Sequence, residues 1–145
     1  MAVTDFDAVI AIAAGLRDAP QWPRTAYEAA STPGVWPQRI ALVAEAADST
    51  IAGFLVAALI PPSAELESIA VTPQLQRRGV ARELLRCLLH DIRPRKCSEI
   101  LLEVRPSNQA GIAFYGALGF EENGRRPSYY ADPVEDGLLM RVAIP

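Results

Sequence analysis

A predicted strand, a basic turn and a predicted amphipathic helix follow one another directly between residues 66 and 92. The strand covers Leu66 to Val71 and ends at Thr72-Pro73. The helix covers Val80 to Ile92 and carries one apolar stripe made of Val80, Leu84, Leu88 and Ile92. This order predicts a fold in which helices pack against a sheet. The turn from Gln76 to Ala81 brings the chain from the strand to the start of that helix.

The turn has the chemistry of a phosphate site. Backbone N–H groups at a helix start have no partner within the helix, and the helix dipole favours an anion there. Gly79 lets a ligand approach the backbone without a Cβ in the way. The common motifs G-x-x-x-x-G-K-[ST] and G-x-G-x-x-G are both absent. We expect a phosphorylated ligand of another class, bound by Gln76, Arg77, Arg78, Gly79, Val80, Ala81 and Arg82; the alternative is an ordinary helix start with surface arginines.

Three segments resemble one family. Residues 76–81 are similar to the [QR]-x-x-G-x-[GA] signature of the GNAT acetyltransferases, which use acetyl-CoA. Residues 101–120 resemble that family's succession of strand, Asn, helix, Tyr and closing Gly-Phe. Residues 125–140 resemble the end of its RimI branch, whose members acetylate the N-terminal residue of a ribosomal protein. The resemblance is close from Ala64 to Ile144 and loose from Met1 to Pro62.

The resemblance and the pattern together imply an α/β (α+β) fold with a mixed central sheet flanked by helices. A length of 145 residues fits a single domain over residues 1–145. Helices are predicted between Thr4 and Asp18 and over 24–30, 80–92 and 108–117, and strands over 39–45, 51–60, 66–71, 100–104, 121–130 and 138–144. Only Met1 to Val3 precede the first helix, so the family's first strand is expected to be very short or absent.

The resemblance implies that Glu103 is the general base and Tyr115 the proton donor. Acetyl transfer requires a neutral amine when it attacks and a protonated thiol when it leaves. For Glu103 the alternative is a strand-end carboxylate paired with Arg105 or Arg141. For Tyr115 it is an aromatic side chain packed under its helix.

The resemblance also implies contacts to the pantetheine arm of CoA. Asn108 would contact the arm through its side chain, although it also suits a helix N-cap. The backbone of Ile69 and Val71 would bond the pantetheine amides as an added strand does. The Val71 N–H would also polarise the thioester oxygen.

Four side chains are candidates for the acceptor site. Glu65 and Glu67 are expected on one strand face with Ile69 and Val71. Glu65 is the second candidate base, by its similarity to histone-type members of the family. The pair could instead attract a cationic N-terminus or simply face solvent. Tyr129 and Tyr130 are adjacent on a predicted strand and are expected to point to opposite faces, so that one of them lines the acceptor groove.

Composition limits the classes of partner and the location expected for this protein. The net charge of −3 gives no sign of nonspecific nucleic-acid binding. No apolar run reaches about 18 residues and no leader pattern is visible, so we expect a cytoplasmic protein without a membrane span. Cys87 and Cys97 are expected to be reduced thiols, and no metal site is expected. The expected partners are acetyl-CoA and a protein or peptide N-terminus, for example on a ribosomal protein, and the expected state is a monomer or homodimer. The alternatives are a GNAT enzyme for a small amine and a non-catalytic acyl-CoA-binding module.

Overall fold

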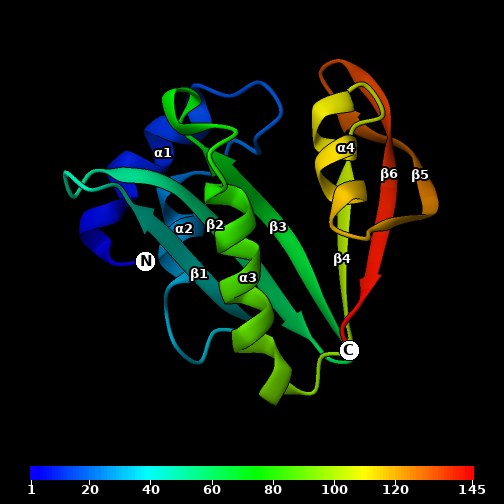
Figure 1. Ribbon diagram of the computed structural model, residues 1–145, viewed down its shortest axis with the longest axis horizontal. Coiled ribbons are helices and arrows are strands. Elements are labelled where there is room, and N and C mark those ends of the chain that lie inside the picture. Colours follow the sequence, from blue (N-terminus) through cyan, green and yellow to red (C-terminus); the bar gives the residue numbers. More distant parts are fainter.

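The computed structural model describes residues 1–145, which form a six-stranded sheet with helices on both faces (Figure 1). Along the sheet the strands run β1 (Gln38–Glu45), β2 (Ile51–Ile60), β3 (Ser63–Val71), β4 (Glu99–Val104), β6 (Val134–Ala143) and β5 (Glu121–Ala131). The helices are α1 (Phe6–Ala14), α2 (Arg24–Ala30), α3 (Val80–Ile92) and α4 (Gln109–Ala117). Only the β3–β4 pair is parallel. The predicted mixed sheet flanked by helices is confirmed.

The N-terminal segment forms no strand before α1. Residues Val3–Asp5 make a short 3-10 turn that leads into the helix. The amino group of Met1 donates a hydrogen bond of 2.9 Å to the carbonyl of Ala41 on β1. The family's first strand is therefore absent, and β1 forms one edge of the sheet.

The bounds of several elements agree with the sequence pattern and others are extended by pairing. Helices α2 and α3 and strand β2 lie where they were predicted. Strand β3 begins at Ser63 rather than Leu66, because residues 63–66 pair with residues 99–102 of β4. Strand β6 begins at Val134 rather than Leu138, because its first residues pair with the end of β5. No helix in the structure is long and apolar enough to cross a membrane.

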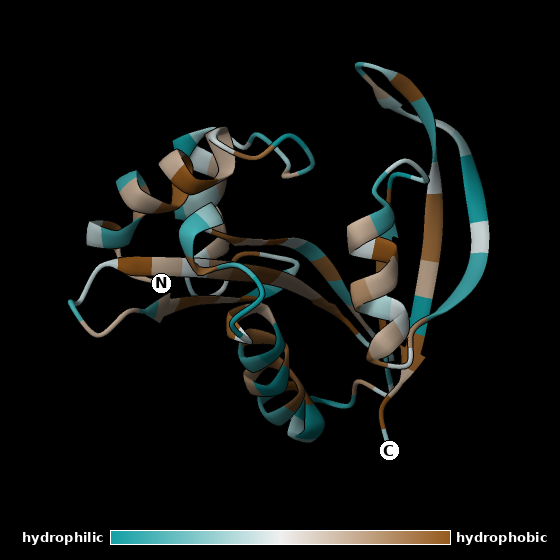
Figure 2. Cartoon of the chain, turned by 45° about the horizontal axis from the view of Figure 1, so that its top comes forward, coloured by the Kyte–Doolittle hydropathy of each residue, from teal (hydrophilic) through white to brown (hydrophobic).

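Two apolar clusters lie on the two faces of the sheet. Helix α3 covers one face and buries Leu84, Leu85, Leu88 and Ile92, as the stripe predicts. Helix α4 packs against the same cluster. Helices α1 and α2 cover the other face with Phe6, Val9 and Tyr27. Figure 2 shows the polar outer side of α3, and it shows β6 largely apolar beside the polar strand β5.

A bulge in β3 changes which side chains share a face. Val56 pairs with Ser68, whereas Ala57 pairs with Leu66, so Glu67 is an extra residue on β3. Leu66 and Ile69 consequently both pack on the α3 side, although they are three positions apart. The expectation that Glu65 and Glu67 share a face with Ile69 and Val71 is wrong, because the bulge reverses the alternation between the two pairs.

Strands β3 and β4 separate after a short parallel ladder. The last paired residues are Leu66 and Leu102, whereas β3 continues to Val71. Figure 1 shows the two halves of the sheet diverging toward the end at which α3 and α4 begin. We call the unpaired region between the ends of β3 and β4 the gap. Of the predicted site residues, Ile69 and Val71 of β3 and Glu103 of β4 lie beyond the last pair.

Candidate active site

The loop before α3 is shaped by two residues with positive φ. Arg77 has φ of 61° and Gly79 has φ of 84°, and Gly79 forms the N-cap of α3. The side chain of Gln76 donates a hydrogen bond of 3.0 Å to the carbonyl of Val71, which ties the loop to the end of β3. The loop is therefore anchored to the strand that borders the gap.

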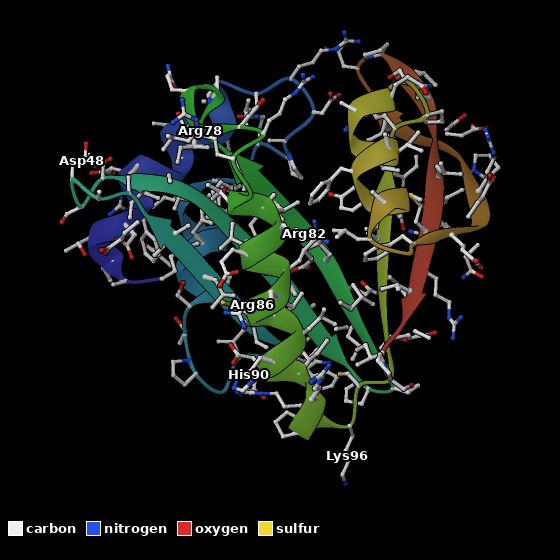
Figure 3. The ribbon with its side chains drawn as sticks, viewed as in Figure 1. Asp48, Arg78, Arg82, Arg86, His90 and Lys96 are labelled. Carbon is white, nitrogen blue, oxygen red and sulfur yellow. The ribbon has the colours of Figure 1, made fainter.

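The backbone at the start of α3 is free to bind an anion. The first helical hydrogen bond runs from the Glu83 N–H to the Gly79 carbonyl, and none of the N–H groups from Arg77 to Arg82 donates within the chain. Arg86 is paired with Glu83 at 2.6 Å. Arg77, Arg78 and Arg82 are exposed and have no ion-pair partner. Figure 3 labels Arg78 in the loop and Arg82 on the first turn of α3. Free N–H groups next to free guanidinium groups fit the diphosphate of a nucleotide cofactor.

The end of β3 offers backbone groups to the gap. The Thr72 N–H donates to the Ala52 carbonyl of β2 at 2.9 Å. Because successive residues of a strand direct their N–H and C=O groups to opposite sides, those of Ile69 and Val71 point away from β2, toward the gap. Val71 offers its N–H there, while its carbonyl already accepts the bond from Gln76. An extended polar chain such as pantetheine can pair with these groups.

Asn108 is the N-cap of α4. Its Oδ1 accepts a hydrogen bond of 2.9 Å from the Gly111 N–H. A Cβ on Gly111 would lie 2.6 Å from the Asn108 Nδ2, so the absence of a side chain there leaves room for the amide. Capping uses only the oxygen, and the Nδ2 group of Asn108 stays available as a donor.

Glu103 lies near the end of β4, where β3 has already diverged. It pairs with neither of the expected arginines, because Arg105 binds Glu135 and Arg141 binds Glu99. Its Oε1 instead lies 3.1 Å from Nη2 of Arg126, and its Oε2 is buried with no hydrogen-bond partner. Burial raises the pKa of Glu103, while Arg126 and then Tyr129 oppose the rise and the negative charge of Glu65 adds to it. A carboxylate with a raised pKa is suited to accept a proton.

Tyr129 and Tyr130 lie together rather than on opposite faces. Their ring centroids are 4.9 Å apart in an edge-to-face arrangement. The β5–β6 pairing is irregular between Arg126 and Tyr130, and Ser128 has φ of 49°, so the strand alternation is lost there. Burial and then the charge of Glu103 raise the pKa of Tyr129, and the same two causes raise the pKa of Tyr130 to about 12. The charge of Glu103 therefore acts on both tyrosines.

Tyr115 lies on α4 with its ring against Phe114 and Phe120. Burial, with a smaller effect of Tyr130, raises its pKa to about 12. The phenol stays protonated at every pH at which a protein α-amine is reactive. Tyr115 can therefore donate a proton or a hydrogen bond.

The two carboxylates of β3 have different surroundings. Glu67 accepts from Nε and Nη2 of Arg39 at 2.7 and 3.0 Å, so its charge is already neutralised. Glu65 is exposed, and its charge acts on Glu103. Of the two, Glu65 alone is free to attract a cationic acceptor.

Three structural contributions were not predicted from the sequence. Arg126 contacts Glu103, and this contact depends on the irregular end of β5. Gly137 makes room for the site, since a Cβ there would lie 3.1 Å from Tyr129 Cβ and 3.2 Å from Glu103 Oε2. Glu135 accepts from Arg105 at 3.0 Å and from the Ser107 hydroxyl at 2.9 Å, which joins the loop before α4 to β6. None of the three gave a usable local signal, since Glu135 and Gly137 precede the strand predicted from Leu138.

Residues 11–120 match the model of the Acetyltransferase (GNAT) family. The match covers most of the chain, and the chain belongs to this family of N-acetyltransferases.

Among the members of this family, the chain is similar to the bS18-alanine N-acetyltransferases. Over 100 residues the chain is 41% identical to the ribosomal protein bS18-alanine N-acetyltransferase of Salmonella typhimurium, a match that covers 68% of each protein. The match to the corresponding enzyme of Escherichia coli K12 is 40% over 96 residues and covers 65% of each, so the chain spans about two thirds of these relatives. The crystal structure of the ribosomal-protein-S18-alanine N-acetyltransferase from Escherichia coli superposes with a TM-score of 0.84 at 30% identity, over 99% of this chain and 90% of that one. A nourseothricin acetyltransferase superposes less well, with a TM-score of 0.69 at 28% identity over 77% of this chain and 70% of that one.

Proposed function

We propose that this chain transfers the acetyl group of acetyl-CoA to the N-terminal α-amine of a protein in the cytoplasm, with a ribosomal protein as the first candidate. The observation that carries the proposal is the buried carboxylate of Glu103 at the gap beside Tyr129 and Tyr130. The similarity to the bS18-alanine N-acetyltransferases supports the choice of acceptor.

The chain's own groups fit acetyl-CoA, which supplies the activated acetyl group when bound. The free N–H groups from Arg77 to Arg82 and the arginine side chains there would hold its phosphates. The backbone of Ile69 and Val71 and the Asn108 amide would hold the pantetheine arm. The Val71 N–H would polarise the thioester carbonyl.

Glu103 and Tyr115 would move the protons. A peptide α-amine has a pKa of about 7.7–8.0, so it arrives largely protonated at neutral pH and needs only a modest base. Glu103 would accept that proton, directly or through water. Tyr115 would protonate the departing thiolate, because its phenol remains neutral.

An acceptor panel tests the proposal. The purified protein and acetyl-CoA are incubated with peptides that begin with free Ala, Ser or Met, with N-blocked lysine peptides and with small polyamines, and acetylation is measured by mass spectrometry. We expect mass gain only on free α-amines. Gain only on lysine peptides or polyamines would contradict the proposal.

A small-amine acceptor is the second candidate. It is favoured by the similarity to a nourseothricin acetyltransferase. The segment before β3 has its own architecture, without a strand before α1. Gain only on the polyamines in the same panel would establish this function instead.

A further inference from the structure

The two oxygens of the Glu103 carboxylate are in different situations. Oε1 lies 3.1 Å from Nη2 of Arg126, whereas Oε2 is buried without a hydrogen-bond partner. The Glu103 side chain is 20% exposed and that of Arg126 is 58% exposed. The mostly buried carboxylate is thus paired with one long and accessible cation.

Arg126 lies on β5 at the point where the regular pairing of β5 with β6 is interrupted. Its pairing with Gly137 is the last before the register shifts to Tyr130 and Glu135. Pro127, which follows, has no N–H to donate to a ladder. The guanidinium group lies over the Tyr129 ring, 5.2 Å from the centroid, and pairs with no carboxylate other than that of Glu103. Because an exposed ion pair and a cation–π contact are each weak, little free energy is needed to move this arginine away from Glu103.

An acceptor amine that gives its proton to Glu103 must reach the carboxylate that Arg126 contacts. A protonated amine and a guanidinium group are both cations with N–H donors, and both would be drawn to the same carboxylate. The other charged or titratable groups around Glu103 are Glu65 from β3 and Tyr129 and Tyr130 from β5. The nearby cation Arg105 lies over the Tyr130 ring, 4.4 Å from its centroid, and is paired with Glu135 at 3.0 Å. Arg126 is therefore the cation that contacts Glu103.

We propose that Arg126 is a displaceable counter-ion of Glu103, which keeps the base ionised before the acceptor arrives and competes with the acceptor's cationic amine. This inference rests on the proposed acetyl transfer to an amine. The ammonium group of the acceptor would replace Arg126, an N–H bond would break as an O–H bond forms on Glu103, and the neutral amine would then attack. Arg126 is in this sense a positioning residue: the acceptor amine must bind the Glu103 carboxylate strongly enough to displace it.

The test compares Arg126→Gln and Arg126→Lys with wild type, and uses Arg125→Gln as the matched control. Arg125 is the neighbouring arginine, and it pairs with the exposed Glu122 at 3.4 Å rather than with Glu103. Initial rates are measured against acceptor concentration and pH, with the amine of the panel that the wild-type protein acetylates. For Arg126→Gln we expect KM for the acceptor to fall about threefold and the acidic midpoint of kcat/KM to rise by about one pH unit. Arg126→Lys should restore the midpoint, and Arg125→Gln should match wild type.

Two outcomes would overturn the inference. A higher KM in Arg126→Gln would show that Arg126 binds the acceptor instead of competing with it. A KM and a midpoint equal to those of wild type would show that the ion pair has no effect on the reaction. Because the assay uses whichever amine the wild-type protein accepts, an acceptor other than an α-amine would refute the proposed function without deciding the role of Arg126.

Discussion

At the residue scale, two carboxylates near the gap could serve as the base, and their surroundings separate them. Glu103 is mostly buried and its pKa is raised, whereas Glu65 is exposed. Glu103→Gln should lower kcat/KM at neutral pH by about 10²- to 10⁴-fold, and Glu65→Gln should have a much smaller effect. The wild-type rate should be lost as pH falls through the raised pKa of Glu103, because the base must be ionised. Rate–pH profiles of both variants check this, and a reversed order would assign the base to Glu65.

At the same scale, the role of Tyr115 as proton donor can be tested by a substitution that removes only its phenolic oxygen. In Tyr115→Phe the phenolic donor is lost while the ring keeps its packing on Phe114 and Phe120. We expect turnover to fall at least about 100-fold and CoA affinity, measured by calorimetry, to stay within about twofold.

Tyr27→Phe is the matched control for the loss of a phenol. The Tyr27 hydroxyl is buried on the other face of the sheet without a hydrogen-bond partner. Its removal should leave turnover unchanged and leave the melting temperature equal or higher. Undiminished turnover in Tyr115→Phe would exclude Tyr115 as the proton donor.

At the element scale, the start of α3 makes a testable phosphate cradle. Gly79 has φ of 84°, and apart from its two chain neighbours no residue has an atom within 4 Å of where its Cβ would be. In Gly79→Val a branched side chain would occupy that space at the start of α3, where the phosphates are proposed to bind. We expect CoA affinity to fall about tenfold or more, which corresponds to about 1.4 kcal/mol.

Gly34→Val separates this effect from backbone strain. Gly34, in the loop between α2 and β1, has φ of 82° and equally open surroundings. Both variants should lose similar stability, of about 1–2 kcal/mol, but Gly34→Val should bind CoA normally. Equal CoA affinities in the two variants would show that the start of α3 does not bind the phosphates of CoA.

The elements also show how far the sequence could predict the site. Helix α3 and the Asn108 cap were predictable, because the apolar stripe and the capping residue act within one turn or element. The faces of Glu65, Glu67, Tyr129 and Tyr130 were not, since they depend on bulges, which are defined by pairing with another strand. The contact between Arg126 and Glu103 was hidden for the same reason, although both residues stand in segments that resemble the family.

At the scale of the whole molecule, the two halves of the sheet are hydrogen-bonded to each other at one end only, while a shared apolar cluster packs against both. Only residues 63–66 and 99–102 join β3 to β4. Glu99 lies at the start of this ladder, where it accepts hydrogen bonds from Ser63 of β3, at 2.6 Å, and from Arg141 of β6. One carboxylate thus links strands from both halves, at the end opposite the gap in which the chemistry is proposed.

This arrangement predicts a stability that depends on pH at one residue. The hydrogen bonds from Ser63 and Arg141 lower the pKa of Glu99. A carboxylate with a lowered pKa stabilises the folded state above its unfolded value of about 4.3 and loses that contribution as pH falls through the folded value. Glu99→Gln should therefore lower the melting temperature at pH 7 by about 3 °C, and the difference from wild type should shrink toward pH 3. Glu122→Gln, at an exposed pair on β5, should change neither value. A difference for Glu99→Gln that stayed constant with pH would mean that the ionised carboxylate does not join the two halves.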